Sequence, residues 1–365
     1  NNIIVSAGAD QTIKIWKFSN QLYEYRKLRG NNDWIRKVVT TKNGKIIFAG
    51  DDGKIRVWDA IKRRQTLSPL IGHTARINAL AVSYDEKHII SGGDDRTIRI
   101  WTQDDNQRYS SIAIKQDAWI RSIAISPRGD FFVTGSWDNN IKVWDLNNKK
   151  QIIINNMTHD ASVEGLAITL DGKYLVSCSD DKTIKLWALN TQTQIGKTIS
   201  AHNGFIRSIV LSNDEKYIVS GSYDNEIKIW SIKENCQKGN ALIGHRNRVN
   251  ALVSKKENII ISCSDDGTIR FWNLNSQKEL KNGTIETDSF ISDIDIMESN
   301  SVLVGVGDNS QIHFWRKDSE KVIHNIYKTL NCNVTDIDIQ LLDESSSLSK
   351  ETLDVLYRNG ANIAI

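Results

Sequence analysis

The stretch Ser91–Trp101 reads SGGDDRTIRIW, and variants of it return throughout the chain. Successive copies end in tryptophans that lie 42 or 43 residues apart. These tryptophans are Trp16, Trp58, Trp101, Trp144, Trp187, Trp230, Trp272 and Trp315. A fixed period of this size is typical of proteins built from structural repeats, so the sequence predicts eight related units.

Each copy has the pattern of a β-hairpin. An apolar run ends in a small residue, an Asp-rich turn follows, and alternating β-branched and charged residues lead to the tryptophan. Period-two alternation on both sides of such a turn predicts a strand, a turn and a second strand. Another apolar run lies upstream, as in 76–83 (RINALAVS), and a polar run lies downstream. The repeat therefore predicts four antiparallel strands, named a, b, c and d in chain order.

These units resemble the WD-repeat (G-beta-like) family, in which each repeat forms one four-stranded blade of a β-propeller. The resemblance covers about residues 1–340. It implies that a hydrogen-bonded His, Ser or Thr, Asp and Trp hold each blade together, because these buried polar groups need partners. Four repeats carry the full set: His73, Ser91, Asp95 and Trp101; His159, Ser177, Asp181 and Trp187; His202, Ser220, Asp224 and Trp230; His245, Ser262, Asp266 and Trp272.

Other repeats depart from this set. Repeat 2 has Asn31 and Phe48 in the His and Ser places, and repeat 4 has Gln116 in the His place. Repeat 8 keeps only its tryptophan and has Thr287, Gly305 and Asn309 in the other three places. We therefore expect repeat 8 to form the loosest blade.

The number of blades is predicted to be eight, with seven as the alternative. Strand a of the even repeats opens with an aromatic residue and isoleucine, at spacings of 85 or 86 residues, and that of the odd repeats does not. The effective unit is then a pair of blades, and four pairs make eight. The aromatic residues are Trp34, Trp119, Phe205 and Phe290.

The ends of the chain suggest how the ring closes. Residues 1–30 supply strands b, c and d of a first blade, whereas Val334–Ile339 look like a strand a without a blade of its own. An open ring would leave unpaired strand edges, so we expect this segment to complete blade 1. The expected domains are an all-β propeller over 1–340, a linker over 341–352 and a strand-like extension over 353–365. The chain begins Asn1-Asn2 rather than with Met, so we expect a piece of a longer protein.

Composition excludes several classes of function. There are 47 basic and 44 acidic residues, a net charge of +3, so charge provides no argument for direct binding of nucleic acid or of a membrane surface. No apolar run is long enough to span a bilayer, and no secretion signal opens the chain. The four cysteines form no CxxC pair, which indicates a reducing intracellular compartment without disulfides. We expect a cytoplasmic protein, with the cytoskeleton and the nucleus as alternatives.

No motif for enzyme chemistry is present. The sequence has no phosphate-binding loop, zinc-protease motif or nucleophile elbow. Some eight-bladed propeller enzymes hold a quinone cofactor or a metal in the central channel, but strand a here offers Arg, Asn and Ser instead of convergent ligands. The repeated Asp-Asp pairs are interpreted as turn formers. We expect no enzymatic activity, no cofactor, no metal and no small-molecule substrate.

The resemblance implies that the start of strand a and the b–c turn reach one face of the ring, the top face, where partners of such proteins dock. Exposed Trp, Tyr and Arg are the residue types that dominate binding hot spots. Blades 4 and 6 gather several of them, beside turns that carry Asp51, Asp94, Asp180, Asp265 and Asp308. The candidate partner-binding residues are Trp34, Arg36, Arg76, Trp119, Arg121, Trp137, Phe205, Arg207, Tyr223 and Arg248. Alternatively, the aromatic residues support packing between blades and the arginines pair with neighbouring aspartates.

The sequence therefore predicts a non-enzymatic scaffold within a large protein assembly. Arg beside an aromatic ring suits a partner with acidic or phosphorylated residues next to an apolar anchor. Two more specific functions remain open: a substrate receptor of a ubiquitin ligase that reads phosphorylated peptides, and a structural subunit of a cytoskeletal, ciliary or RNA-processing particle. A reader of modified histone tails is less favoured, because arginines stand where an acidic channel mouth would be needed.

Overall fold

A computed structural model describes residues 2–7, 12–18, 23–29, 34–59, 64–255, 258–286, 290–297, 302–304, 312–318 and 321–327. The chain divides into two units, 1–327 and 328–365. The second unit, and with it the expected strand Val334–Ile339, the linker and the extension, lies outside the described residues. The described part is built from β-strands, and no helix in it is long and apolar enough to cross a membrane.

The described residues form six complete blades, numbered 2 to 7 after the repeats that supply them. Blade 2 consists of β4 (Ile35–Thr40), β5 (Lys45–Gly50), β6 (Lys54–Asp59) and β7 (Arg64–Gln65), with β8 (Leu70–Ile71) also paired to β6. Blade 3 consists of β9 (Ile77–Val82), β10 (His88–Gly93), β11 (Thr97–Gln103) and β12 (Tyr109–Lys115). Blade 4 consists of β13 (Ile120–Ile125), β14 (Phe131–Ser136), β15 (Asn140–Asp145) and β16 (Gln151–Thr158).

Blades 5 to 7 repeat the same antiparallel order. Blade 5 consists of β17 (Val163–Ile168), β18 (Tyr174–Ser179), β19 (Thr183–Ala188) and β20 (Thr193–Ser200). Blade 6 consists of β21 (Ile206–Leu211), β22 (Tyr217–Ser222), β23 (Ile227–Ser231) and β24 (Cys236–Gln237). Blade 7 consists of β25 (Val249–Lys255), β26 (Ile259–Ser264), β27 (Thr268–Asn273) and β28 (Lys278–Glu286).

The prediction of eight blades, with seven as the alternative, is wrong for the described residues, which contain six. Repeat 1 gives only the three-stranded sheet β1 (Asn2–Ala7), β2 (Thr12–Phe18) and β3 (Tyr23–Arg29). Repeat 8 gives two separate pairs, β29 (Asp295–Met297) with β30 (Val302–Val304) and β31 (Ile312–Asp318) with β32 (Lys321–Tyr327). Repeat 8 lacks the His, Ser and Asp that, in blades 3, 5, 6 and 7, tie strands b and c to the loop before strand a, which gives a physical reason for its incomplete sheet.

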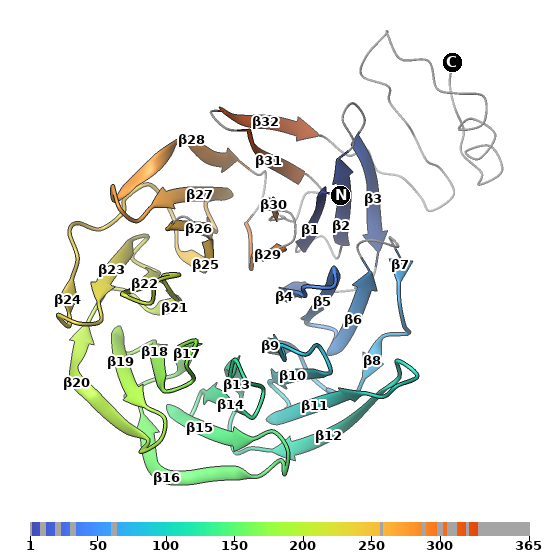
Figure 1. Ribbon diagram of the computed structural model, residues 1–365, viewed down its shortest axis with the longest axis vertical. Helices are drawn as coiled ribbons and strands as arrows, with labels where there is room; N and C mark the ends of the chain where they lie inside the picture. The colour runs from blue at the N-terminus through green and yellow to red at the C-terminus, as the bar shows by residue number, and fades with distance from the viewer. Residues whose placement is uncertain are drawn as a thin grey trace. The chain divides into compact units, whose positions relative to one another are not determined.

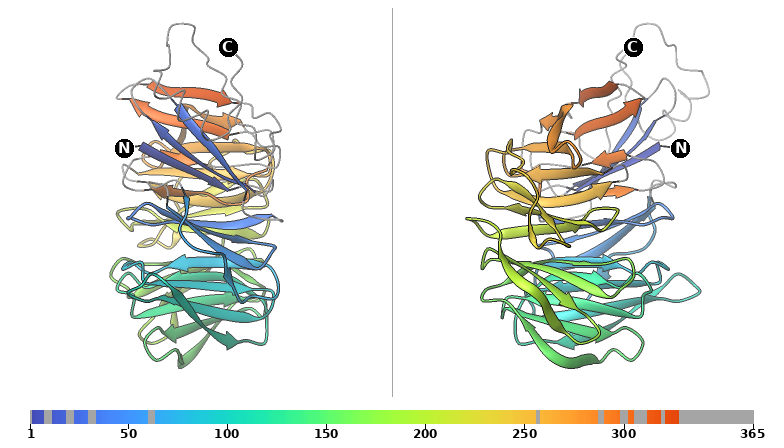
Figure 2. Two further views of the ribbon diagram at one scale, coloured as in Figure 1. Left: turned by 90° about the vertical axis from the view of Figure 1, so that its right-hand side faces the viewer. Right: turned by 60° about the vertical axis from the view of Figure 1, so that its left-hand side comes forward.

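The blades of the first unit follow one another around a common centre (Figure 1). Strand a is innermost, and β4, β9, β13, β17, β21 and β25 contact one another in that order. Seen from the side, the strands of the blades run between the two faces of the ring (Figure 2). Segment 290–297 lies between blades 7 and 2, because β29 contacts both β25 and β4. Repeat 8 therefore contributes to the junction between blades 7 and 2. The predicted closure by Val334–Ile339 concerns residues outside the described part and stays a prediction.

The hydrophobic core lies between neighbouring blades. One cluster joins Ile47 and Val57 of blade 2 to Ile77 and Trp101 of blade 3, and clusters of the same composition recur from blade to blade. Close packing explains the small residue that follows the Ser of strand b. A Cβ atom on Gly92 would lie 2.3 Å from Cγ2 of Ile120 in blade 4, so a larger side chain would push the two blades apart.

Candidate functional site

The four complete sets of His, Ser, Asp and Trp form hydrogen-bonded chains inside their blades. In blade 5, Trp187 Nε1 donates to Ser177 Oγ at 2.8 Å, and Ser177 Oγ lies 2.7 Å from His159 Nε2. His159 Nδ1 lies 2.8 Å from an Asp181 oxygen. A carboxylate only accepts, so Nδ1 donates to Asp181, and in the neutral imidazole Nε2 then accepts from the serine hydroxyl. The same chain runs from Trp101, Trp230 and Trp272 in blades 3, 6 and 7.

Blade 4 shows what happens without the histidine. Trp144 Nε1 still donates to a hydroxyl, that of Thr134, at 3.0 Å. The Gln116 amide oxygen accepts from Lys142 Nζ at 2.7 Å, so this side chain takes part in a different interaction. Asp138 accepts from the hydroxyl of Ser136 instead of from an imidazole. The blade therefore keeps its tryptophan anchor and replaces the rest of the chain.

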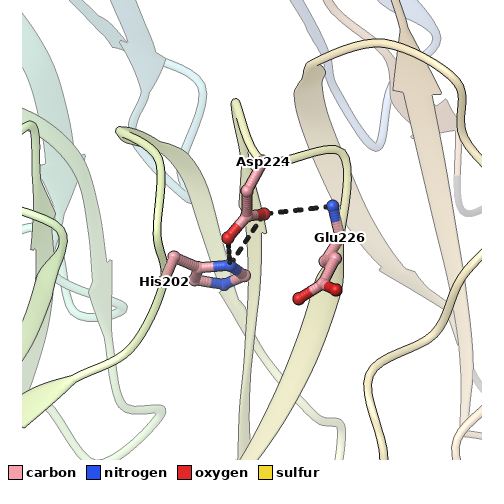
Figure 3. A group of neighbouring side chains, drawn as sticks. All are labelled: His202, Asp224 and Glu226. Atoms are coloured by element: carbon pink, nitrogen blue, oxygen red, sulfur yellow. Dashed lines mark hydrogen bonds and ion pairs between the residues drawn. The ribbon is translucent and has the colours of Figure 1, made fainter.

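The side chains of His202, Asp224 and Glu226 lie close enough together to suggest a metal site (Figure 3). The hydrogen bonds argue against it. His202 Nδ1 donates to Asp224 at 2.9 Å, and Nε2 accepts from Ser220 at 2.8 Å. Neither ring nitrogen therefore has a lone pair to offer a metal. Glu226 stands where blades 3, 5 and 7 have a threonine, and it pairs with Lys228 at 3.2 Å. The group belongs to the structural chain of blade 6.

A β-bulge near the start of strand a is common to all six blades. The pairing with strand b skips one residue, for example Arg121 between the pairs Ile120↔Ser136 and Ser122↔Gly135. A bulge leaves the extra residue outside the ladder and turns its side chain in a new direction. The bulge residues are Arg36, Asn78, Arg121, Glu164, Arg207 and Asn250. The top face of each blade is defined here by this residue, by the residue two positions earlier and by the b–c turn.

All five predicted top-face arginines form ion pairs with carboxylates. Arg36 pairs with Asp51, Arg76 with Asp94 and Arg248 with Asp265, each within its own blade. In blades 3 and 7 the bulge asparagine adds a second bond: Asn78 and Asn250 each donate to the same aspartate at 2.6 Å. These turns are therefore neutral units of one arginine, one asparagine and one aspartate.

The remaining two arginines share one carboxylate of the blade between them. Arg121 of blade 4 donates to Glu164 of blade 5 at 3.0 Å, and Arg207 of blade 6 bonds the other oxygen of Glu164. Burial alone would raise the pKa of Glu164, but Arg207 and Arg121 together hold it below its ordinary value. Three consecutive blades are thus linked through one buried carboxylate.

Aromatic pairs stand on either side of this linkage. In blade 4 the rings of Trp119 and Trp137 lie 5.1 Å apart, and Trp137 is 59 % exposed. In blade 6 the rings of Phe205 and Tyr223 lie 5.9 Å apart, and Phe205 is 44 % exposed. Tyr223 is held in place by guanidinium groups, because Arg207 and Arg248 each lie 4.9 Å from its ring centroid. Blades 4 and 6 therefore each present an aromatic pair at the top face.

Trp34, the remaining predicted residue, lies away from this group. It is exposed at the start of blade 2, and its ring lies 6.3 Å from that of Phe290. Blades 4 and 6 therefore place their aromatic residues on either side of blade 5, whereas Trp34 belongs to the junction with repeat 8.

Glu164, Asn78, Asn250 and Phe290 were not among the predicted site residues. A signal for Glu164 exists in the sequence: it occupies the place in strand a that Arg121 and Arg207 occupy in blades 4 and 6. Its contacts with both arginines could not be read from the repeat, because they cross from one blade to the next. The asparagines likewise require knowledge of the bulge.

A family model described as "WD domain, G-beta repeat" matches residues 22–59, 63–102, 111–145, 151–188, 193–231 and 236–273. These six matches agree with the six complete blades. Propellers of this family typically serve as non-enzymatic scaffolds for protein interactions.

Named relatives match over short segments. Nuclear distribution protein PAC1 of Arthroderma benhamiae is 34 % identical over 74 residues, which is 20 % of this chain and 16 % of that protein. PAC1 of Coccidioides posadasii is 30 % identical over 83 residues, or 22 % and 17 %. Protein transport protein SEC13 homolog A of Arabidopsis thaliana is 33 % identical over 63 residues, or 15 % and 21 %. The chain thus matches about a fifth or less of the length of each relative. Because the family model covers more than half of its residues, the chain belongs to the WD-repeat family of β-propellers.

Proposed function

We propose that this propeller is a non-enzymatic scaffold that binds a protein partner on the top face of blades 4 to 6. The observation that carries the proposal is the pair of aromatic surfaces, Trp119 with Trp137 and Phe205 with Tyr223, on either side of blade 5. Large aromatic side chains that stay exposed and fixed bury much area on binding and lose little conformational freedom. They suit a partner with apolar anchors.

The ion pairs of the top-face arginines affect which charge a partner is expected to carry. The expectation of an acidic or phosphorylated ligand rests on the five arginines, and each of them already has a carboxylate partner. A ligand anion would have to compete with these carboxylates. The phosphopeptide receptor of a ubiquitin ligase is therefore less supported than a scaffold that uses aromatic anchors.

The relatives favour membership of a larger assembly. Their names describe nuclear distribution and protein transport. We therefore keep the structural subunit of a multiprotein particle as the context in which the scaffold acts, with the cytoplasm as the proposed compartment. The linker 341–352 and the extension 353–365 stay predictions.

The test is quantitative affinity purification from cells that express the chain. Wild type is compared with the double variant Trp119→Ala/Trp137→Ala, after thermal unfolding has shown that both fold equally well. The proposal expects a defined set of partners to be lost from the variant.

Trp34→Ala is the matched control, because it removes an exposed tryptophan from blade 2. It should keep the partners that the double variant loses. If the double variant retained every partner, the binding site would lie elsewhere and the proposal would be wrong.

A further inference from the structure

The b–c turn of most blades carries an aspartate just before the structural Asp, and blades 3 and 7 show how it is neutralised. In blade 3, Asp94 accepts from Arg76, two residues before the bulge, and from Asn78 at the bulge. In blade 7, Asp265 accepts from Arg248 and Asn250 in the same arrangement. Each of these carboxylates is thus met by a cation and an amide of its own blade.

Blade 5 has the aspartate without these partners. Ser162 stands in the place of Arg76, and Glu164 stands in the place of Asn78. The backbone is the same, since Asp180 N donates to Ser162 O as Asp94 N donates to Arg76 O. Asp180 Oδ1 is buried and has no hydrogen-bond partner. Buried carboxylate oxygens without partners are rare, and each one calls for an explanation.

We infer that the top face of blade 5 binds a lysine or arginine side chain of the partner, with Asp180 as its carboxylate and the aromatic pairs of blades 4 and 6 beside it. The inference deepens the proposed function and rests on it. The ligand cation would do for Asp180 what Arg76 does for Asp94. The cation would bond to Asp180 Oδ2, or to Oδ1 after a small rotation of the side chain.

The shape of blade 5 fits this ligand. Ser162 is small and buried, whereas arginines with side chains 45 % and 47 % exposed stand at this place in blades 3 and 7. Trp119 and Phe205 hold the same place in the blades on either side, and both belong to aromatic pairs. A cation beside aromatic rings gains from their negative faces as well as from the carboxylate.

The electrostatics of Asp180 point the same way. Burial and the neighbouring Glu164 raise the pKa of Asp180 to about 6, against the opposing effect of Arg207 and Arg121. Asp181, the next residue, also raises it. Two guanidinium groups lie near Asp180, but both are bonded to Glu164. The negative charge of Asp180 is therefore not balanced by a cation of its own.

The experiment titrates the whole chain with four capped pentapeptides whose central residue is arginine, norleucine, glutamate or phosphoserine between leucines. Binding is followed by calorimetry at pH 7. The arginine peptide should bind on the order of tenfold more tightly than the norleucine peptide, as expected for one hydrogen-bonded charge pair. Asp180→Asn should abolish this preference and leave the affinity for the norleucine peptide unchanged.

Asp94→Asn is the matched control: it changes a turn aspartate that already has an arginine, and it should keep the preference. Acidification from pH 7 to pH 5 should weaken binding of the arginine peptide, because a protonated Asp180 no longer attracts a cation. An acidic ligand would show the opposite trend.

Three results would overturn the inference: no binding of the arginine peptide, tighter binding of the glutamate or phosphoserine peptide, or an unchanged preference in Asp180→Asn. Failure here is distinguishable from failure of the proposed function. If Trp119→Ala/Trp137→Ala loses cellular partners while Asp180→Asn keeps its peptide preference, the aromatic surface binds partners but blade 5 takes no basic side chain.

Discussion

Among single residues, the tryptophans that end repeats 3 to 7 are buried, and each donates a hydrogen bond to a hydroxyl of its own blade. Trp187 is 4 % exposed, packs against blade 4 and donates its N–H to Ser177. Trp187→Ala should lower the free energy of unfolding by ~3–5 kcal/mol, the usual range for losing a buried Trp. Chemical denaturation, monitored by circular dichroism, measures this difference in the free energy of unfolding.

The same substitution at an exposed tryptophan shows whether the loss of stability comes from buried packing or from losing any tryptophan. Trp137 is 59 % exposed and its ring pairs with that of Trp119, so Trp137→Ala should lower the free energy of unfolding by about 0.5–1.5 kcal/mol. Equal effects of the two variants would contradict the assignment of Trp187 to the core.

The structural aspartates make stability depend on pH. Burial would raise the pKa of Asp181, but hydrogen bonds from His159, Thr183 and the Asp160 amide lower it well below its ordinary value of 3.8. A lowered pKa means that Asp181 contributes stability above about pH 4, and this contribution is lost as the pH falls further. Asp181→Asn should therefore be less stable than wild type at pH 7.

The measurement is urea denaturation of both proteins at pH 7, 4 and 3. The difference in free energy of unfolding should narrow as the pH falls. A constant difference would show that the charge of Asp181 plays no part.

Among elements, the bulge in strand a explains how one repeat yields different surfaces. It places one side chain per blade at the top face without disturbing the buried residues on either side, such as Ile120 and Ser122 around Arg121. The bulge residue can therefore be arginine, asparagine or glutamate while the blade stays the same.

The outer strands are joined across blades by a buried glutamine. Gln192 of blade 5 donates to Ile152 O at 2.9 Å and accepts from Ile154 N at 3.0 Å, both in β16 of blade 4. Gln192→Ala would leave these backbone groups without that partner. It should cost about 1–3 kcal/mol and speed hydrogen exchange at the Ile154 amide.

Gln194 supplies the control. It lies on β20, and its amide donates to Thr198 on the same strand. Gln194→Ala should leave exchange at Ile154 unchanged. If the two variants behaved alike, Gln192 would not be joining the blades.

At the scale of the whole molecule, two acidic side chains hold segment 290–297 against blade 2. Asp293 accepts from Val38 N at 3.1 Å and from Lys37 Nζ at 3.1 Å, and Asp295 accepts from Thr40 N at 2.7 Å. Asp293 and Asp295 lie two residues apart, and this matches the two-residue spacing of the Val38 and Thr40 N–H groups in β4. Polar contacts therefore join segment 290–297 to blade 2.

This junction should respond to pH in the opposite sense to the structural aspartates. Burial raises the pKa of Asp295 to about 6, against hydrogen bonds from Thr40 and Ile296. A raised pKa means that its contribution to stability is fully present below about pH 4 and is lost as the pH rises through 6. Asp295→Asn keeps an acceptor for Thr40. Relative to wild type, its free energy of unfolding should therefore be highest at pH 7 and lower at pH 4.

Denaturation of wild type and Asp295→Asn between pH 4 and pH 8 tests this. If the difference in free energy of unfolding between the two proteins did not change with pH, the pKa of Asp295 would not be raised.

The repeat alone determined much of this protein. The period, the Asp-rich turn and the tryptophan predicted four antiparallel strands per repeat, because these strands depend on contacts within one blade. The resemblance to the WD-repeat family predicted the propeller. The sequence also predicted aromatic and basic residues at the starts of strand a, and it left open whether the arginines would pair with neighbouring aspartates.

Only the tertiary structure decided the number of complete blades, the junction through Asp293 and Asp295, and the sharing of Glu164 by Arg121 and Arg207. All three depend on contacts between blades. The sequence repeat specifies what each blade is, whereas curvature, closure and pairing across blades depend on which side chains meet at each interface. Those partners are 43 residues or more apart in the chain, so no pattern within a repeat reveals them.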